Sequence, residues 1–229
     1  MKIELAEKRK IAANASKGTS SDAIYSAFEN LLIELNSPDR IKILDFGAGT
    51  GNLTKRIDLL KLNCSISAID IMPRPSLLEK DIEWISHDLN NETNFVSESF
   101  DVIVSAEVIE HLENPREVVR EWFRLLRPQG TLIFSTPNNE SYRSLIALLF
   151  KGHYAAFSNL NYPAHITPLL RKDAERILQE TGFSQPKFVF TNSGMIPKVT
   201  FLKWQQISGG LLKGLRYSDN LIVIAKKIV

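Results

Sequence analysis

The sequence predicts an α/β fold: a doubly wound, seven-stranded, mostly parallel sheet with helices on both faces. Short apolar runs that end in polar residues alternate with stretches able to form helices, which is typical of βαβ units. A glycine cluster at residues 47–51 directly follows the first apolar run. Acidic residues end three successive strands, at Asp45, Asp70 and Asp88. In such folds the ligand lies beyond the carboxyl ends of the strands, so these features predict a binding site there.

Seven apolar runs are expected to form the strands of this sheet. Five early runs cover residues 41–46, 65–70, 82–86, 100–105 and 131–136, and two late runs cover residues 187–191 and 221–226. The stretches between them are long enough for crossover helices.

Helices are marked by capping residues and by apolar side chains at helical spacing. One begins after residues 20–22 and ends near residues 36–38, and a second has Asn114 as N-cap, Pro115 at its first position and a turn at residues 127–130 as its end. A third begins at residues 167–168 and ends at Gly182. A helix also follows the glycine cluster, and the residues before Ser20 are expected to form a mobile arm.

Composition is that of one globular domain. The chain has 229 residues, of which 44% are hydrophobic and 24% charged, and no linker-like segment divides them, so residues 1–229 are expected to form a single domain. The lone Cys64 excludes an intramolecular disulfide and favours a reduced compartment. Because residues 1–14 lack the apolar stretch of a secretory signal, we expect a cytoplasmic protein.

The net charge of +2 is too small to indicate a nucleic-acid partner, so no DNA is expected and RNA is disfavoured. Residues 195–229 carry six basic residues against Asp219 alone. This basic segment could contact an anionic acceptor or a membrane surface. A solvated face is the alternative interpretation.

The stretch from Ile43 to Gly51 resembles motif I of the class I S-adenosylmethionine-dependent methyltransferases, which have a Rossmann-like fold. The resemblance continues through Asp70, through residues 87–89 after the third strand, and through residues 100–112 and 125–138 around the fourth and fifth strands. Rossmann dehydrogenases instead need glycines at the first, third and sixth places of the turn, and here the sixth place is Asn52.

This resemblance implies S-adenosylmethionine as cofactor and S-adenosylhomocysteine as product. The glycines would let backbone N–H groups approach the methionine part of the cofactor, and Asp70 would accept the ribose hydroxyls. Ile71 and Met72 would flank the adenine, and Asp88 would accept its amino group. The complete expected cofactor set is Asp45, Phe46, Gly47, Ala48, Gly49, Gly51, Asp70, Ile71, Met72, Asp88, Leu89, Ser105, Ala106 and Glu107.

A short helix after the fourth strand is expected to place Glu107, Glu110 and His111 on one face. We predict His111 as the general base that takes a proton from an acceptor hydroxyl. Asn138 and His165 are the further catalytic candidates, although Asn138 could equally cap the next helix.

The Glu-x-x-Glu-His pattern is also similar to the divalent-metal cluster of small-RNA 3′-end methyltransferases, where a later histidine, here His165, completes the set. That resemblance implies Mg²⁺ or Mn²⁺ and a metal-assisted RNA 3′-end 2′-O-methyltransferase. Residues 166–170 lack the charged and aromatic context that accompanies that histidine, so no metal is expected.

Residues 139–165 form a long, aromatic connection that predicts an acceptor lid. Residues 135–138 resemble ubiquinone-type O-methyltransferases, and the segments around His153 and His165 resemble methyltransferases of sugars and surface polysaccharides. The predicted function is therefore O-methylation of a small-molecule or glycan-like acceptor. A non-catalytic module that only binds the cofactor is a further alternative.

Overall fold

The central sheet of the computed structural model, which describes residues 2–35 and 37–228, has seven strands in the order β3-β2-β1-β4-β5-β9-β6. The strands are β1 Ile41–Phe46, β2 Cys64–Asp70, β3 Glu83–Ser86, β4 Phe100–Ala106, β5 Leu126–Pro137, β6 Lys187–Phe190 and β9 Asn220–Lys226. Pairing from β3 to β5 is parallel, whereas β9 is antiparallel to both of its neighbours. The predicted fold class and all seven predicted strands are confirmed.

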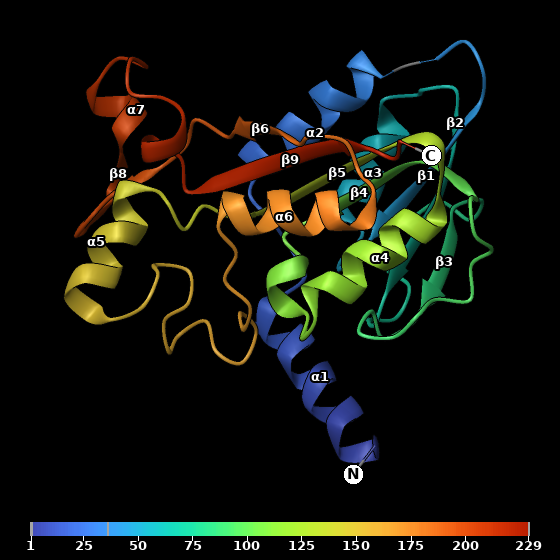
Figure 1. The fold of residues 1–229 in the computed structure, drawn as a ribbon, viewed down its shortest axis with the longest axis horizontal. Coiled ribbons are helices and arrows are strands. Elements are labelled where there is room, and N and C mark those ends of the chain that lie inside the picture. The colour runs from blue at the N-terminus through green and yellow to red at the C-terminus, as the bar shows by residue number, and fades with distance from the viewer. Residues whose placement is uncertain (1, 36, 229) are drawn as a thin grey trace.

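Helices cover both faces of the sheet, giving three layers (Figure 1). On one face lie α2 Asp22–Glu34 and α3 Asn52–Leu59, and on the other α4 Pro115–Leu125 and α6 Arg171–Thr181. Central strands are buried on both sides, which explains their continuous apolar sequences. Along β1, Ile43 faces the α2–α3 layer, whereas Leu44 and Phe46 face the α4–α6 layer.

The helix ends follow the predicted capping chemistry. Ser21 Oγ accepts from the backbone N–H of Ile24 at 3.4 Å, and Asn114 Oδ1 accepts from Arg116 N–H at 3.2 Å. Gly182 ends α6 with a φ of 107°, in the left-handed region. The predicted turn at residues 127–130 is instead the first part of β5, which begins at Leu126 immediately after α4.

The predicted start of α6 at residues 167–168 is wrong by a few residues, because tertiary hydrogen bonds hold that segment in an extended form. The backbone N–H groups of Ile166 and Thr167 donate to the carbonyl oxygen of Glu110, and Thr167 Oγ1 donates to that of Leu112. The segment is thereby fastened to η1 (Ile109–His111), a short 3-10 helix that follows β4.

The N-terminal segment is a helix, α1 Lys2–Ser16, and the expected mobile arm is wrong. Figure 1 shows α1 projecting from the body of the sheet beneath the loop that follows β4. Its Arg9 side chain is the anchor, because it makes ion pairs with Asp88 and Glu113.

The remaining elements gather at one end of the molecule, away from the C-terminus (Figure 1). They are α5 Tyr142–Lys151, the hairpin β7 Met195–Ile196 and β8 Val199–Lys203, α7 Trp204–Ile207 and the 3-10 helix η2 Leu215–Tyr217. The hairpin and α7 were not predicted, since their strands are short and lack a clear periodicity. Among the described residues, no helix has both the length and the apolar character needed to cross a membrane.

Candidate functional site

A cavity of about 670 Å³ opens beyond the carboxyl ends of β1, β2 and β4. The glycine turn, Asp70 and Asp88 form one wall, and η1 with residues 162–166 forms another. Helix α1 covers part of the opening with Leu5, Arg9 and Ala12. This is the position in which doubly wound sheets bind ligands.

The glycine turn is shaped by close backbone approach. Gly47 has a φ of 85°, and a Cβ atom there would overlap the side chain of Val108. Gly49 has a φ of 54°, and a Cβ atom there would overlap the carbonyl oxygen of Gly18. A side chain is excluded at both positions, so the backbone itself forms this part of the cavity wall.

Asp70 is held rigidly at the end of β2. Its Oδ2 accepts from the backbone N–H of Gly49 and its Oδ1 from that of Met72, both at 2.8 Å. Burial raises the pKa of the Asp70 carboxyl, while the hydrogen bonds from Met72 and Gly49 oppose the rise. Each oxygen keeps a further lone pair, so the carboxylate can still accept hydrogen bonds from a ligand in the cavity.

Asp88 is shared between its own loop and α1. Its Oδ1 accepts from the backbone and side-chain N–H groups of Asn90 at 3.0 Å, and its Oδ2 accepts from Arg9 Nη1 at 2.8 Å. Burial would raise the pKa of Asp88, but the hydrogen bonds from Asn90 and Arg9 outweigh it and the net shift is downward. Arg9 also donates to both carboxylate oxygens of Glu113, at 2.9 and 2.6 Å. This one guanidinium group therefore fastens α1 across the cavity.

Asp45 lies deepest, with 1% of its surface exposed. Its Oδ2 accepts from the Thr54 hydroxyl at 2.6 Å, and its Oδ1 has no hydrogen-bond partner among the described residues. Burial raises its pKa from 3.8 to about 7. An Asp at this depth without a cation beside it is strongly biased toward its neutral form.

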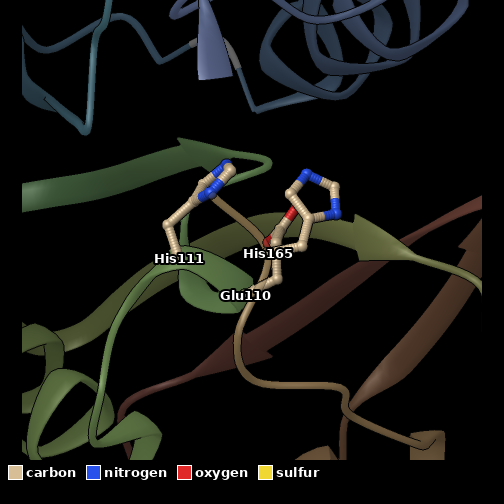
Figure 2. Close-up of side chains that lie close together, drawn as sticks. All are labelled: Glu110, His111 and His165. Carbon is tan, nitrogen blue, oxygen red and sulfur yellow. The ribbon is translucent and has the colours of Figure 1, made fainter. Parts of the chain in front are cut away.

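Figure 2 shows Glu110, His111 and His165 with their side chains turned toward one another. One potential ligand atom from each lies within 4.8 Å of the other two. Glu110 is fully buried, and neither of its carboxylate oxygens has a hydrogen-bond partner among the described residues. A buried carboxylate needs a proton or a cation, so this cluster has one of the two.

Burial favours the neutral form of both histidines of the cluster. His111 Nδ1 lies 2.8 Å from the carbonyl oxygen of Ala164, so it carries the proton and leaves Nε2 with a free lone pair. Burial lowers the pKa of His111, and burial together with His111 lowers that of His165 to about 4. Glu107 lies beside them, with its pKa raised by burial to about 7 and its Oε2 accepting from Asn220 at 2.8 Å. The cavity thus presents to a ligand the His111 imidazole, whose neutral form burial favours.

The structure brings most of the predicted site residues to the cavity. Its wall includes Asp45, Gly47, Ala48, Gly49, Asp70, Ile71, Met72, Asp88, Leu89, Ala106, Glu107, His111 and His165. Phe46, Gly51 and Ser105 are not part of the wall. Ser105 Oγ donates to the carbonyl oxygen of Phe46 at 2.8 Å and ties β4 to β1, while Gly51 is the N-cap of α3. These three act behind the wall and not on it.

The structure does not bring Asn138 to the cavity. Its side-chain N–H₂ donates to the carbonyl oxygens of Leu215 at 2.6 Å and Ser218 at 2.7 Å, so it fastens η2 to the end of β5. The predicted capping role is also wrong, because Ser141 is the N-cap of α5. Of the predicted lid at residues 139–165, Tyr162, Pro163 and His165 line the cavity.

The contribution of α1 was missed by sequence reasoning. Leu5, Arg9, Ala12, Ala13 and Ser16 recur at helical spacing and all line the cavity. That spacing was the available signal, but the many charged residues between them obscured it.

The pH dependence of folding stability tests the placement of Asp45. Because the folded state holds this proton more tightly than the unfolded chain, the free energy of unfolding should fall as pH rises from 3.8 to about 7. Relative to Asp45→Asn, the free energy of unfolding of the wild type should fall by roughly 4 kcal/mol at most across that window, at about 1.36 kcal/mol per pKa unit. Urea denaturation at several pH values measures this. The exposed-site control Asp39→Asn should follow wild type, and parallel curves for wild type and Asp45→Asn would contradict the assignment.

Comparison with known proteins identifies the family of this chain. Residues 21–185 match a family model described as a methyltransferase domain. The mitochondrial ubiquinone biosynthesis O-methyltransferase of Rattus norvegicus is 26% identical over 170 residues, 68% of this chain and 47% of that protein. The ubiquinone biosynthesis O-methyltransferase of Nitrosococcus oceani is 35% identical over 118 residues, 47% of this chain and 48% of that protein. The chain thus spans about half the length of these relatives.

Solved structures agree on the fold. A 1,6-didemethyltoxoflavin-N1-methyltransferase from Burkholderia thailandensis superposes with a TM-score of 0.65 and 15% identity, covering 100% of this chain and 90% of the other. A SAM-dependent methyltransferase from Archaeoglobus fulgidus superposes with a TM-score of 0.63 and 17% identity, covering 93% of this chain and 96% of the other. The family model spans well over half of the chain, and the seven-stranded sheet matches the fold of these solved methyltransferases. The chain therefore belongs to the class I S-adenosylmethionine-dependent methyltransferases.

Proposed function

We propose that this chain transfers a methyl group from S-adenosylmethionine to an oxygen atom of a small-molecule acceptor. The observation that carries the proposal is one cavity with two chemically different walls. A wall of glycine backbone and carboxylates suits a nucleoside with an amino-acid tail, and the opposite wall presents the neutral Nε2 of His111. The names of the relatives, O-methyltransferases of ubiquinone biosynthesis, support oxygen as the acceptor atom.

The residues of the first wall have distinct parts in binding. S-adenosylmethionine, when bound, supplies a methyl group already activated on a sulfonium. Asp70 would accept hydrogen bonds from the ribose hydroxyls, using the lone pairs that are not taken by the N–H groups of Gly49 and Met72. Asp88 would accept a hydrogen bond from the adenine amino group. Arg9, which pairs with Asp88 across the opening, would shield that hydrogen bond from water. The Gly47–Gly49 backbone approaches the methionine part, and Val108 and Gly18 leave no room for a side chain at these two glycines.

The residues of the second wall act on the acceptor. His111 is held by its Nδ1–H bond to Ala164, which fixes the tautomer and points Nε2 away from that carbonyl group. Nε2 takes the proton of the acceptor hydroxyl, a step that contributes about 10²- to 10⁴-fold to the rate. Tyr162 and Ile166 add apolar surface beside it, which favours a small, partly apolar acceptor. A glycan-like acceptor would stack on the same aromatic surface.

A second candidate is a metal-assisted form of the same transfer, favoured by the unpartnered carboxylate of Glu110. One carboxylate and two imidazoles fit a divalent cation such as Mn²⁺, and Glu110, His111 and His165 would hold it. A bound cation there would polarise an acceptor oxygen. Because His111 Nε2 cannot both bind a cation and accept a proton, the two mechanisms exclude each other. An RNA acceptor for this form stays a prediction.

Replacing Asp70 tests the assignment of the ribose site. An Asn at this position cannot accept from two backbone N–H groups and two ribose hydroxyls, and it loses the charge that strengthens those bonds. We expect Asp70→Asn to weaken S-adenosylhomocysteine binding by about 10- to 100-fold, the loss of about 1.5–3 kcal/mol expected for a charged hydrogen bond. Calorimetric titration measures the affinity, and Asp39→Asn is the control. If Asp70→Asn keeps the wild-type melting temperature and binds S-adenosylhomocysteine with wild-type affinity, the ribose assignment is wrong.

Replacing His111 tests its part in turnover, and a metal chelator then separates proton transfer from cation binding. For a phenolic, sugar or glycan acceptor that turns over with labelled cofactor, His111→Gln should lower kcat by about 10²- to 10⁴-fold with little change in cofactor affinity. Under the favoured mechanism a chelator leaves turnover unchanged, and Mn²⁺ or Mg²⁺ leaves the melting temperature unchanged. A rise in melting temperature with Mn²⁺ that Glu110→Gln abolishes would favour the metal-assisted form instead.

A further inference from the structure

Large apolar side chains are exposed on three neighbouring segments at one end of the molecule. Leu149 and Phe150, at the end of α5, are 77% and 74% exposed, Phe201 on β8 is 82% exposed, and Leu211 after α7 is 85% exposed. We refer to these four residues and their surroundings as the docking surface. Isolated exposed apolar residues are ordinary, but four that are almost fully exposed on adjoining elements indicate a contact.

The elements of the docking surface are packed together. Lys198, between β7 and β8, places its ammonium group 6.0 Å from the centre of the Phe150 ring. The ring of Tyr217 contacts Tyr142 on α5 at 5.4 Å and Trp204 on α7 at 5.5 Å between centres. Figure 1 shows α5, α7 and β8 at the same end of the molecule. The exposed side chains therefore belong to one region of the surface.

Basic residues predominate in the segments that form this region. Residues 141–170 and 181–218 contain seven basic residues and no Asp or Glu, although the chain has 26 acidic residues in all. The rest of the chain therefore has 21 basic residues against those 26. Arg143 pairs with Asp219, whereas the exposed Lys151, Lys198, Lys203 and Lys213 form no ion pair among the described residues. Lysines without an ion-pair partner thus lie on the same segments as the exposed apolar side chains.

We propose that the docking surface binds peripherally to an anionic lipid bilayer. Its apolar side chains enter the boundary between headgroups and acyl chains, and the four lysines face the lipid phosphates. A second copy of this chain is a poorer occupant, because pairing the surface with itself would bring these unpaired lysines together.

The connection from α5 to α6 links the docking surface to the cavity along the chain. Tyr162 and Ile166, which line the cavity, belong to the same acid-free segment and are 72% and 40% exposed. Docking would bring that wall of the cavity close to the bilayer. Binding to lipid needs neither cofactor nor methyl transfer, so its failure would leave the proposed function untouched.

Vesicle flotation of the purified full chain tests this proposal. Vesicles of phosphatidylcholine alone should leave the protein unbound, whereas an equal mixture with phosphatidylglycerol should carry it upward, less so as salt rises. Lys198→Gln with Lys203→Gln should weaken binding by about fivefold per lysine. Leu149→Ser with Phe150→Ser should weaken it at every salt concentration, since buried apolar area drives insertion.

Matched controls keep the test specific. Lys55→Gln with Lys80→Gln removes two exposed lysines elsewhere, on α3 and before β3, and Leu59→Ser removes an exposed apolar side chain on α3. Both control variants should bind like wild type. The proposal is overturned if mixed vesicles leave the protein unbound, if the controls weaken binding equally, or if light scattering shows a dimer that Leu149→Ser with Phe150→Ser dissolves.

Discussion

The turn from β1 into α3 is the constraint on which the rest of the site depends. Three segments meet there with no room for a side chain: the turn itself, Gly18 between α1 and α2, and Val108 after β4. Thr50 N–H and Thr50 Oγ1 both donate to the Gly18 carbonyl oxygen at 3.0 Å, so the turn also fixes where α1 leaves the fold. The same turn supplies Gly49 N–H to Asp70. Backbone proximity thus sets the position of the carboxylates, the covering helix and the cavity together.

Burial then divides the acidic residues into two groups with different chemistry. Asp70 and Asp88 receive hydrogen bonds from backbone or guanidinium donors, so they are prepared to accept from a ligand. Asp45, Glu107 and Glu110 are buried with unpartnered oxygens, and their pKa values are raised. The cavity therefore combines carboxylates that are held by hydrogen bonds, at Asp70 and Asp88, with carboxyl groups whose neutral form is favoured by burial, at Asp45 and Glu107.

The sheet was predictable from sequence because its strands are buried on both faces, and their apolar runs reflect burial alone. The cavity wall that carries the glycine turn was predictable for a related reason, since glycines and strand-end acids lie in short contiguous motifs. Features that depend on contacts between distant segments were not. The Asn138 side chain donates to the carbonyl oxygens of Leu215 and Ser218. Hydrogen bonds to the Glu110 carbonyl oxygen keep residues 166–167 out of α6. Arg9 anchors α1 through its ion pairs with Asp88 and Glu113. The spacing of residues along the sequence does not indicate which distant residues will become their partners.

The most direct measurement is calorimetric titration of the purified chain with S-adenosylmethionine, S-adenosylhomocysteine and NAD in parallel. The glycine spacing, the paired acceptors at Asp70 and Asp88 and the family membership predict micromolar binding of both adenosyl compounds and none of NAD. Binding of NAD without the adenosyl compounds would contradict the account, because it would mean that the cavity accommodates a dinucleotide despite Asn52 at the sixth place of the turn.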